Sequence, residues 1–479
     1  MASDQPVVIV WFRQDLRLTD NPALIAAAKD RQKILPLYIL DDENSGQWKM
    51  GAASRWWLHN SLSDLNRRID GHLCLAKGDA LSILEDILRQ KKVSAVYWNR
   101  CYEPWCIKRD TKIKSTLTDH GIRVKSFNGS LLCEPHLISK KDDTPYKVFT
   151  PFYQKGLSEH LPPPLPKPAP TQLKWCKHTI VSLKALNLLP DIKWYQSIKK
   201  IWTPGEQEAQ KYLNSFLQQG LPDYKKGRDY PAKESTSRLS PYLHFGELSP
   251  FQIWHTVQKS MFVQRLETQG AHFLRELGWR EFSYYLLYHF PDLPKKNMQP
   301  KFNHFPWRDN KRAIIRWQKG QTGYPVVDAG MRELWQTGYM HNRVRMITAS
   351  FLVKNLLQHW HHGEKWFWDT LVDADLANNS ASWQWVAGSG ADAAPYFRIF
   401  NPVTQGQKFD TQGNYVRRYI PELAALPDKY LHCPWTAPED VLKSSGVILD
   451  DNYPSPMVDL KTSRESALSA FAKIKTDSV

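Results

Sequence analysis

Hydrophobic and polar positions follow two different patterns along the chain, and the first covers roughly the first 130 residues. Short apolar runs typical of buried strands alternate there with segments that have helical apolar spacing. The predicted strands are 7–12, 34–40, 73–77, 95–99 and 124–127, and the predicted helices are 21–30, 55–69, 80–91 and 107–119. Continuous apolar strands separated by helices favour a parallel, doubly wound α/β sheet. The absence of GxGxxG and of a loop ending in GK[ST] argues against an ordinary dinucleotide or triphosphate site.

A proline-rich segment separates the two patterns. Residues 161–170, LPPPLPKPAP, are incompatible with a helix and are expected to run extended, within a linker that reaches about residue 200. Beyond it, Thr203-Pro204-Gly205-Glu206 is typical of a helix start with proline in the first turn. Helical spacing then recurs at 206–219, 250–260, 265–290, 310–319, 327–336, 340–359 and 364–372, with a short polar helix or frayed end after about 465. We predict an α/β domain over 1–132, a linker over 133–202 and a large all-α domain over 203–479.

Composition narrows the environment and the partner. A net charge of +16 and a pI near 9.4 fit either a polyanionic partner or a merely basic protein. Six scattered cysteines without a CxxC pair disfavour zinc and iron–sulfur sites and suit a reducing compartment. The N-terminus lacks a signal pattern, and no apolar run approaches the roughly 18 residues of a spanning helix. We therefore expect a cytoplasmic protein with no membrane partner, or a nuclear one in a eukaryotic host.

One segment, FLRELGWREFSYYLLYHF at 273–290, places three functional side chains on one helical face. Glu276, Trp279 and Arg280 are spaced i, i+3, i+4. Together they could hydrogen-bond a base edge, stack on the base and neutralise a phosphate. Taken alone, the segment fits better a surface helix with a salt bridge and one packed tryptophan.

A second segment, 339–360, repeats this spacing with Asn342, Arg345 and Met346, while Arg343 points elsewhere and could contact a phosphate. Met346 offers a polarizable contact to an aromatic surface, although core filling is the plain alternative. In the third segment, 368–402, Asp373 could form a buried ion pair with Arg345. Metal binding by Asp373 and Asp375 is disfavoured because no third ligand has suitable spacing.

Several long motifs give the chain a family resemblance. They are WFRQDLRLTDNPAL, ESTSRLSPYLHFGELSP, ELGWREF, TGYPVVDAGMREL, MHNRVRMITASF and DADLANNSASWQW through DAAPYFRIFNP. In this order, over nearly the whole chain, they resemble the photolyase/cryptochrome family. The resemblance implies an α/β domain, a long connector and a helical domain that holds a U-shaped FAD. It also implies a monomer that acts on UV-damaged DNA, associated with the nucleoid in a bacterium.

The resemblance assigns side chains to FAD. Phosphate and ribitol contacts fall on Tyr224, Thr236, Ser237, Arg238, Leu239 and Ser240, where hydroxyls and amides at a helix start suit phosphate. The flavin and adenine side is assigned to Trp279, Arg280, Asn342, Arg345, Asp373, Asp375 and Asn379. Asn379 matches the position facing flavin N5, where plant cryptochromes carry an acid. Its amide favours the fully reduced, anionic flavin that donates an electron in repair.

Three tryptophans, Trp307, Trp360 and Trp383, match the electron-transfer chain of the family, although all three could also be core residues. The set that contacts DNA and substrate is Glu276, Trp279, Asn342, Arg343, Met346 and Trp385. Relatives that repair (6-4) lesions carry histidine where Met346 lies, to move protons. Glu276, Asn379 and Met346 are therefore the predicted catalytic residues for splitting a flipped-out cyclobutane pyrimidine dimer, with Glu276 steadying its carbonyl edge.

For the antenna, Glu103 matches a folate-contacting acid of related proteins, although an exposed loop carboxylate is the alternative. The resemblance favours 5,10-methenyltetrahydrofolate over 8-hydroxy-5-deazaflavin or FMN. A cryptochrome-type photoreceptor is the second interpretation, weakened by the absence of a long extension after Val479, and a single-strand-specific photolyase is the third. Ser380, Ala381 and Ser382 replace glycines of many relatives and are expected to reshape a flavin-side loop. Tyr339 stands where many relatives have tryptophan.

Overall fold

The computed structural model describes residues 6–476, which pack as two compact units. Within the described residues, unit 1 comprises 6–222 and Ser237–Pro291, and unit 2 comprises Asp223–Thr236 and 292–476. These units are defined by packing and do not correspond to the predicted domains, so the predicted domain boundaries at 132 and 202 stay a prediction. Each unit is described by itself below.

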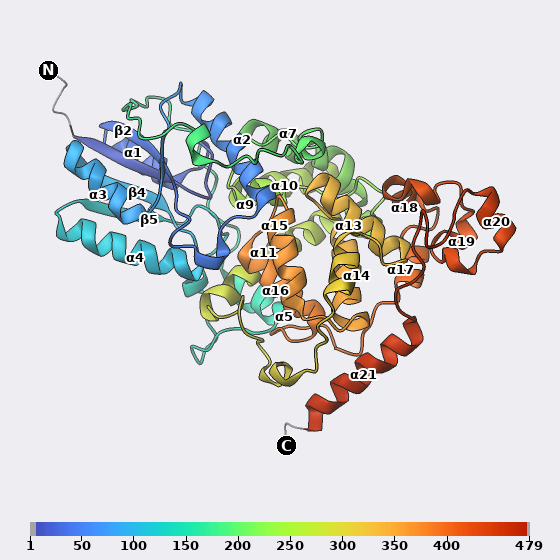
Figure 1. Cartoon of the computed structure of the whole chain (residues 1–479). Coiled ribbons are helices and arrows are strands. Elements are labelled where there is room, and N and C mark those ends of the chain that lie inside the picture. Colours follow the sequence, from blue (N-terminus) through green and yellow to red (C-terminus); the bar gives the residue numbers. More distant parts are fainter. Residues whose placement is uncertain (1–5, 477–479) are drawn as a thin grey trace. The chain divides into compact units, whose positions relative to one another are not determined.

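A five-stranded parallel sheet forms the core of unit 1 (Figure 1). Its strands are β1 (Val7–Phe12), β2 (Lys33–Leu40), β3 (Cys74–Lys77), β4 (Val93–Asn99) and β5 (Arg123–Phe127), in the order β3-β2-β1-β4-β5. The predicted strands and the doubly wound sheet are confirmed. The strand order reverses between β1 and β4, so the loops after these two strands flank the switch point where open α/β sheets usually bind ligands.

Helices connect these strands, as the alternating pattern predicted: α1 (Pro22–Lys29), α2 (Ala52–Arg68), α3 (Ala80–Gln90) and α4 (Pro104–Asp119). The Asn21 side chain caps α1 by accepting from the Leu24 amide, and Asp79 caps α3 by accepting from the Ser82 amide. Helices α3 and α4 pack against the sheet face that carries Ile9, through Leu84, Ile87, Ile113 and Leu117.

The segment between sheet and helices is largely irregular, as expected for a linker. It contains α5 (Phe149–Pro151) and α6 (Gln196–Lys199), and residues 161–170 form neither helix nor strand, which confirms the prediction for the proline run. Isolated bridges join Trp175 to Ile34 and Val181 to Leu75. The linker therefore lies against the edge region of the sheet within unit 1.

The remaining helices of unit 1 are α7 (Glu206–Ser215), α9 (Ser240–His244), α10 (Pro250–Gln264) and α11 (Glu267–His289). Helix α7 begins at the predicted place, but Pro204 lies outside its first turn, which corrects one detail of the prediction. Gly205 is the N-cap with φ of 129°, a conformation that favours glycine, and a Cβ there would approach the Asp64 carboxylate to 2.7 Å.

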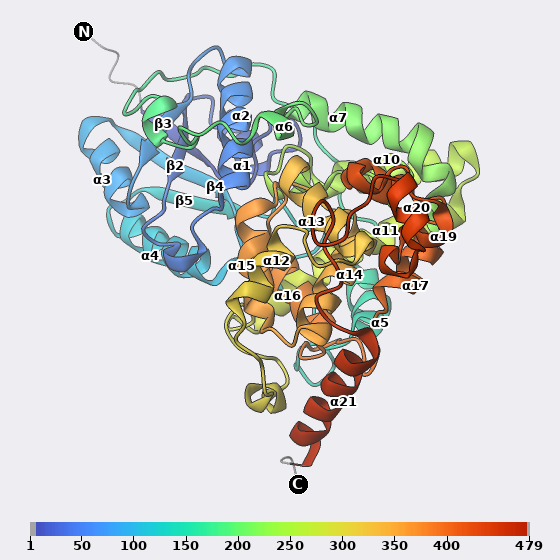
Figure 2. The same cartoon turned by 45° about the vertical axis from the view of Figure 1, so that its right-hand side comes forward.

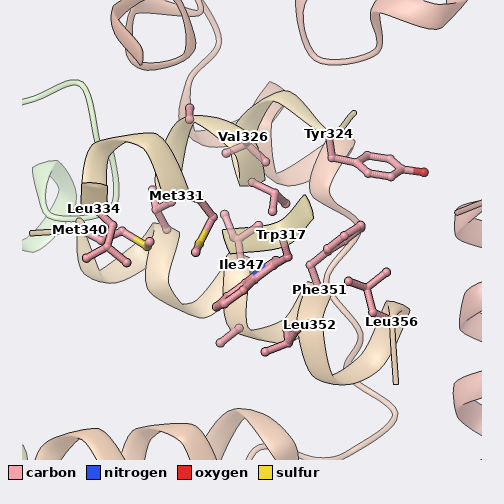
Figure 3. Close-up of a cluster of buried hydrophobic side chains, with 14 of the residues drawn as sticks. Trp317, Tyr324, Val326, Met331, Leu334, Met340, Ile347, Phe351, Leu352 and Leu356 are labelled. Atoms are coloured by element: carbon pink, nitrogen blue, oxygen red, sulfur yellow. The ribbon is translucent and has the colours of Figure 1, made fainter. Parts of the chain in front are cut away.

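Unit 2 is helical. Its helices are α8 (Tyr224–Gly227), α12 (Lys311–Gln318), α13 (Pro325–Thr337), α14 (Asn342–Ser350), α15 (Trp360–Thr370), α16 (Leu376–Ala387), α17 (Pro402–Phe409), α18 (Asn414–Tyr419), α19 (Asp428–Leu431), α20 (Glu439–Ser444) and α21 (Leu460–Thr476). Figure 2 shows α12, α13, α14 and α16 grouped together, with α21 at one end of the group. Apolar side chains of α12, α13 and α14 fill their common core around Trp317, whose Nε1 donates to the Thr348 carbonyl over 3.0 Å (Figure 3).

Two helix predictions in unit 2 are wrong. The predicted helix 340–359 stops early: α14 ends at Ser350, a wider turn covers Phe351–Asn355, and Leu357 has φ of 54°. The apolar spacing continued past this break because Leu356 and Leu357 enter the core. The second error is α16, which was not predicted because its asparagines and serines have modest helix propensity. Ser380, Ala381 and Ser382 consequently lie in a helix and not in a loop.

Candidate functional site

The six residues predicted to hold the FAD phosphates and ribitol lie on both units. Tyr224 and Thr236 belong to unit 2, whereas Ser237, Arg238, Leu239 and Ser240 belong to unit 1. Ser237 Oγ accepts from the Leu239 amide over 3.4 Å, and Ser240 begins α9. Arg238 has φ of 53°, and its guanidinium lies 4.4 Å from the ring centre of Trp202. The backbone here is therefore held in a compact, partly left-handed turn.

On α11, Glu276, Trp279 and Arg280 are half-buried, so none of them is a core residue. The Trp279 ring stacks on Phe149, with 3.7 Å between ring centres and 9° between planes. This contact covers one face of the indole and fixes its orientation. Phe149 was not recognised from the sequence, where it is one of four aromatic residues in the linker segment 146–153.

Arg280 is tied down by its surroundings in unit 1. Its Nη1 donates to the Ser130 carbonyl over 2.8 Å and to Glu281 over 3.2 Å. Burial raises the pKa of Glu281 to about 7, although Arg280 and the amides of Leu132 and Cys133 oppose this rise. Glu281 was also missed by the sequence analysis, because a buried acid next to an arginine resembles an ordinary surface pair.

Unit 2 contains the predicted ion pair. Both carboxylate oxygens of Asp373 accept from Arg345 Nη2, at 2.9 and 3.1 Å, and Arg345 Nε donates to the Met340 carbonyl over 2.7 Å. Burial acts to lower the pKa of Arg345, but Asp373, Tyr339 and Glu333 together outweigh it and the pKa is raised. The guanidinium also lies 5.1 Å from the ring centre of Tyr339, so this phenol supports the pair by a cation–π contact.

Asp375 and Asn379 are both buried on α16 and have different tasks. Asp375 is the N-cap, and its carboxylate accepts from the amide and the side chain of Asn378, each over 2.8 Å. Asn379 Nδ2 donates to the Glu364 carbonyl over 3.0 Å, so its side-chain oxygen is the atom available to a ligand. Ser380, next to it, donates to the Glu364 carboxylate over 2.6 Å. Two hydrogen bonds from α16 to α15 thus fix the position of Asn379.

The predicted DNA-contacting residues of unit 2 differ in their availability. Asn342 is exposed, and Met346 and Trp385 are partly exposed. Arg343, in contrast, forms an ion pair with Asp229 at 2.5 Å and lies 4.5 Å from the ring centre of Phe409. A contact of Arg343 with a phosphate stays a prediction, and it would have to compete with this ion pair.

The three tryptophans of the predicted electron-transfer chain all lie in unit 2, two of them buried and the third partly exposed. Trp383 is buried and packs against Gly363, where a Cβ would collide with its ring. Trp360 is fully buried, and its Nε1 donates to Asn297 over 2.9 Å. Trp307 is partly exposed. Gly363 lies one turn after Trp360 on α15. The Trp383 ring therefore packs on α15 about one turn from Trp360.

Glu103 is buried, so the alternative of an exposed loop carboxylate is wrong. It follows β4 and accepts from Gln14 Nε2, which follows β1, over 2.6 Å. Its second oxygen, Oε2, is buried without a hydrogen-bond partner among the described residues. The carboxylate therefore sits at the switch point of the sheet with one acceptor site unused.

Two thiols lie beside this carboxylate. The ligand atoms of Cys101, Glu103 and Cys106 are all within 4.8 Å of one another. Sulfur and oxygen donors of this kind suit a thiophilic metal ion. However, the buried guanidiniums of Arg13 and Arg109 interact with these thiols, and positive charges at this place oppose a cation. The cluster therefore carries no metal assignment.

Comparison with known proteins decides the family. The family model "DNA photolyase" matches residues 8–171, and "FAD binding domain of DNA photolyase" matches residues 273–473. A deoxyribodipyrimidine photo-lyase of Agrobacterium fabrum is 49% identical over 475 residues, which is 98% of each chain. This chain belongs to the photolyase/cryptochrome family. The predicted family and two-part fold are thereby confirmed, and the second match identifies FAD as the cofactor of the family's helical domain.

Proteins named photolyase and proteins named cryptochrome are both similar to this chain. A crystal structure of a bacterial class III photolyase from Agrobacterium tumefaciens has a TM-score of 0.95 and 47% identity, and the match covers 99% of both chains. Cryptochrome-2 of Arabidopsis thaliana is 39% identical, over 98% of this chain and 79% of its own length. Among residues 6–476, no helix combines the length and the apolar character needed to cross a bilayer.

Proposed function

We propose that this chain is a light-dependent DNA repair enzyme that splits cyclobutane pyrimidine dimers. The full-length likeness to a deoxyribodipyrimidine photo-lyase carries this proposal. The structure supports it because Glu276 and Trp279 in unit 1, and Met346 and Trp385 in unit 2, are all at least partly exposed. Side chains of these types can contact a substrate only if they are not fully buried in the core.

The residues of unit 2 fit a flavin cofactor. Arg345 and Asp373 form a preorganised, partly buried ion pair, and the Asn379 side-chain oxygen is left available by the bond from its nitrogen to Glu364. A ligand with polar edges and a flat apolar ring needs such fixed partners in a low-polarity pocket. Asn342, Arg345, Asp373, Asp375 and Asn379 would hold the flavin and adenine side. FAD supplies, when bound and reduced, the electron that light sends to the dimer.

The side chains around the substrate bind and orient it. Trp279, braced by Phe149, offers one rigid face for stacking on a pyrimidine. Glu276 would hydrogen-bond the carbonyl edge of the dimer, and Met346 would contact it without taking part in proton transfer. A dimer stacks and pairs poorly, so that flipping it out of the duplex costs less than flipping normal bases. The net charge of +16 would supply salt-dependent affinity for the phosphate backbone.

Trp383, Trp360 and Trp307 would pass electrons inward from the partly exposed end of the series. Their burial increases from Trp307 to Trp360, as expected for a path from solvent into the unit. This path would restore the reduced cofactor under light, and it is separate from repair itself. Enzyme that has been reduced chemically should therefore repair without it.

Glu103 would hold an antenna chromophore, for which we propose 5,10-methenyltetrahydrofolate. Its unpartnered oxygen could accept from the N–H edge of a pterin, and the switch point of the sheet is the expected location for such a ligand. An 8-hydroxy-5-deazaflavin or FMN offers similar donors. We further propose that the enzyme is a cytoplasmic, nucleoid-associated monomer.

The test is repair of defined substrates. Reduced protein is illuminated with duplex and single-stranded oligonucleotides that contain one dimer, and the remaining dimer is measured by chromatography. We expect repair of the duplex in light and none in darkness. Repair restricted to single strands would favour the single-strand branch, and no repair of either would favour a photoreceptor. Glu276→Gln should slow repair, whereas Glu267→Gln, an exposed change on the same helix, should not.

A further inference from the structure

Histidines surround the outer tryptophans of the proposed electron path, where the sequence reads HWHH at 359–362. The His359 ring lies 5.6 Å from the Trp360 ring, with 27° between the planes. It also meets Trp307 edge-on, with 5.1 Å between ring centres and 62° between planes. One imidazole therefore contacts both indoles, and all three residues belong to unit 2.

The local backbone defines which form of this imidazole is present. His359 is the N-cap of α15, and its Nδ1 accepts from the His361 amide over 3.2 Å. An accepting Nδ1 must keep its lone pair, so the ring is neutral with its proton on Nε2. Burial, followed by His361, His362 and Lys365, lowers the pKa of His359 to about 4, in agreement with this geometry. A neutral ring adds no charge that would oppose the positive charge on an oxidised indole.

We propose that His359 is a positioning residue for electron transfer between Trp307 and Trp360. Its ring keeps the two indoles in packed contact and fills the space between them with a neutral, aromatic group. In this step Trp307 gives one electron to oxidised Trp360, which is restored, and an external thiol then reduces Trp307. This inference rests on the proposed role of the tryptophan path.

Two substitutions separate the ring from the cap. His359→Asn keeps a side-chain oxygen that caps a helix well but removes the ring. His359→Phe keeps an aromatic ring but removes the capping atom. In light with a thiol donor, we expect the asparagine variant to accumulate reduced cofactor about tenfold more slowly, a change that corresponds to about 1.4 kcal/mol in the barrier. The phenylalanine variant should stay close to the wild-type rate.

Transient absorption gives a second readout that a loss of stability alone would not change. We expect a smaller long-lived signal from oxidised tryptophan in His359→Asn, while dimer repair by chemically reduced enzyme stays at the wild-type rate. Thermal unfolding should rank the variants the other way, because only His359→Phe loses the cap. His362→Asn, in the same turn of α15, is the matched control and should behave as wild type.

The outcomes are distinguishable. If Trp307→Phe is photoreduced as fast as wild type, the tryptophan path itself is wrong. If Trp307→Phe is impaired and His359→Asn is not, the path stands and the role of His359 is overturned. Loss of photoreduction in His359→Phe, alone or together with His359→Asn, would also overturn it, because it would show that an aromatic ring at this place is not sufficient.

Discussion

Two groups of tryptophans in this protein differ in how they end. In unit 1, Trp57 packs against Trp202 at 5.5 Å and Tyr242 at 5.0 Å, and its Nε1 donates to Glu247 over 3.1 Å. Trp57 is 0% exposed and Trp202 is 2% exposed, so both indoles are closed off from solvent; the partly exposed ring at the end of this cluster is the phenol of Tyr212, which stacks on Trp202 at 5.8 Å. In unit 2, Trp360 is equally buried at 0%, but the series continues through His359 to the partly exposed Trp307.

The comparison teaches that burial alone does not reveal the use of a tryptophan. A cluster whose indoles are all closed off from solvent stabilises the fold, whereas a series of indoles that reaches solvent can also exchange electrons with a reductant. Neither the number of tryptophans nor the apolar spacing around them separates the two cases. The contacts at the end of each cluster do, and they can be tested.

The largest effect expected from this contrast comes from one matched pair of substitutions. Trp360→Phe removes the oxidisable indole from the middle of the path, and photoreduction should fall by about a hundredfold, or about 2.7 kcal/mol in the barrier. Trp57→Phe, at an equally buried position of the closed cluster, should leave the rate unchanged. Photoreduction of bound FAD with a thiol donor measures both. An equal loss in the two variants would contradict the distinction.

Two buried carboxyl groups, one in each unit, also differ in their surroundings. Glu247 in unit 1 is surrounded by neutral donors, whereas Asp373 in unit 2 faces Arg345. Asp373→Asn should lower the free energy of unfolding by about 2 kcal/mol, below the usual range for buried pairs because Arg345 is partly solvated. It should also lower the FAD content of the purified protein.

Urea denaturation gives the matched comparison for this pair. Asp86→Asn breaks the exposed Asp86–Arg89 pair on α3 and should cost less than about 1 kcal/mol. If both variants lost the same stability, burial of the Asp373 pair would have no special weight.

The contact between Trp383 and α15 offers a smaller and more local change. Gly363→Ala places a methyl group against the Trp383 ring and should cost about 1–2 kcal/mol through overpacking. Because the ring must move, photoreduction should also slow by a few-fold. Repair by chemically reduced enzyme reports whether the displacement of the Trp383 ring reaches the substrate side. Full repair with slowed photoreduction would confine the displacement to the tryptophan path. Unchanged photoreduction would contradict the close packing of Trp383 on Gly363.

One buried carboxyl group in unit 1 should give a dependence of stability on pH, in place of a single change in stability or rate. Burial raises the pKa of Glu247 to about 8, so the folded state binds a proton that the unfolded state has lost above its ordinary pKa. The stability that depends on this proton is therefore lost as pH rises toward 8, at up to about 1.4 kcal/mol per pH unit. Glu247→Gln should remove this slope, which urea denaturation between pH 5 and 8 would measure against wild type.

Unit 2 provides the opposite sign as a control. Burial lowers the pKa of Lys354 to about 7, so the unfolded state binds more protons between about pH 7 and the ordinary lysine value. The stability linked to Lys354 therefore increases over that interval. Lys354→Met should flatten this rise, whereas Glu247→Gln should leave it unchanged; slopes of the same sign would contradict the assigned burial.

The sequence predicted the sheet well because its central strands β1, β2 and β4 are largely buried on both faces and appear as nearly continuous apolar runs. Helix α16 was not predicted because the asparagines and serines that follow its N-cap Asp375 have modest helix propensity. Their helical conformation depends on contacts with α15. The helical prediction also continued through Leu357, where the backbone turns with a positive φ. The apolar spacing did not reveal this turn, because a side chain can be buried without being helical.

The candidate site was predictable in part. Spacing on one helix grouped Glu276 with Trp279, and the acidic Asp373 within an apolar stretch indicated its ion pair with Arg345. Partners distant in sequence were not predictable: Phe149 lies 130 residues before Trp279, and Asp229 lies 114 residues before Arg343. Such contacts depend on tertiary packing, which no local pattern encodes.

The most direct test of the central claim is illumination of anaerobically reduced enzyme with a duplex that contains a single cyclobutane thymine dimer. We predict that light converts the dimer to two thymines, and that Met346→His lowers the yield because the apolar contact is lost. Reduced, flavin-loaded enzyme that binds this duplex but leaves the dimer intact under light would contradict the account.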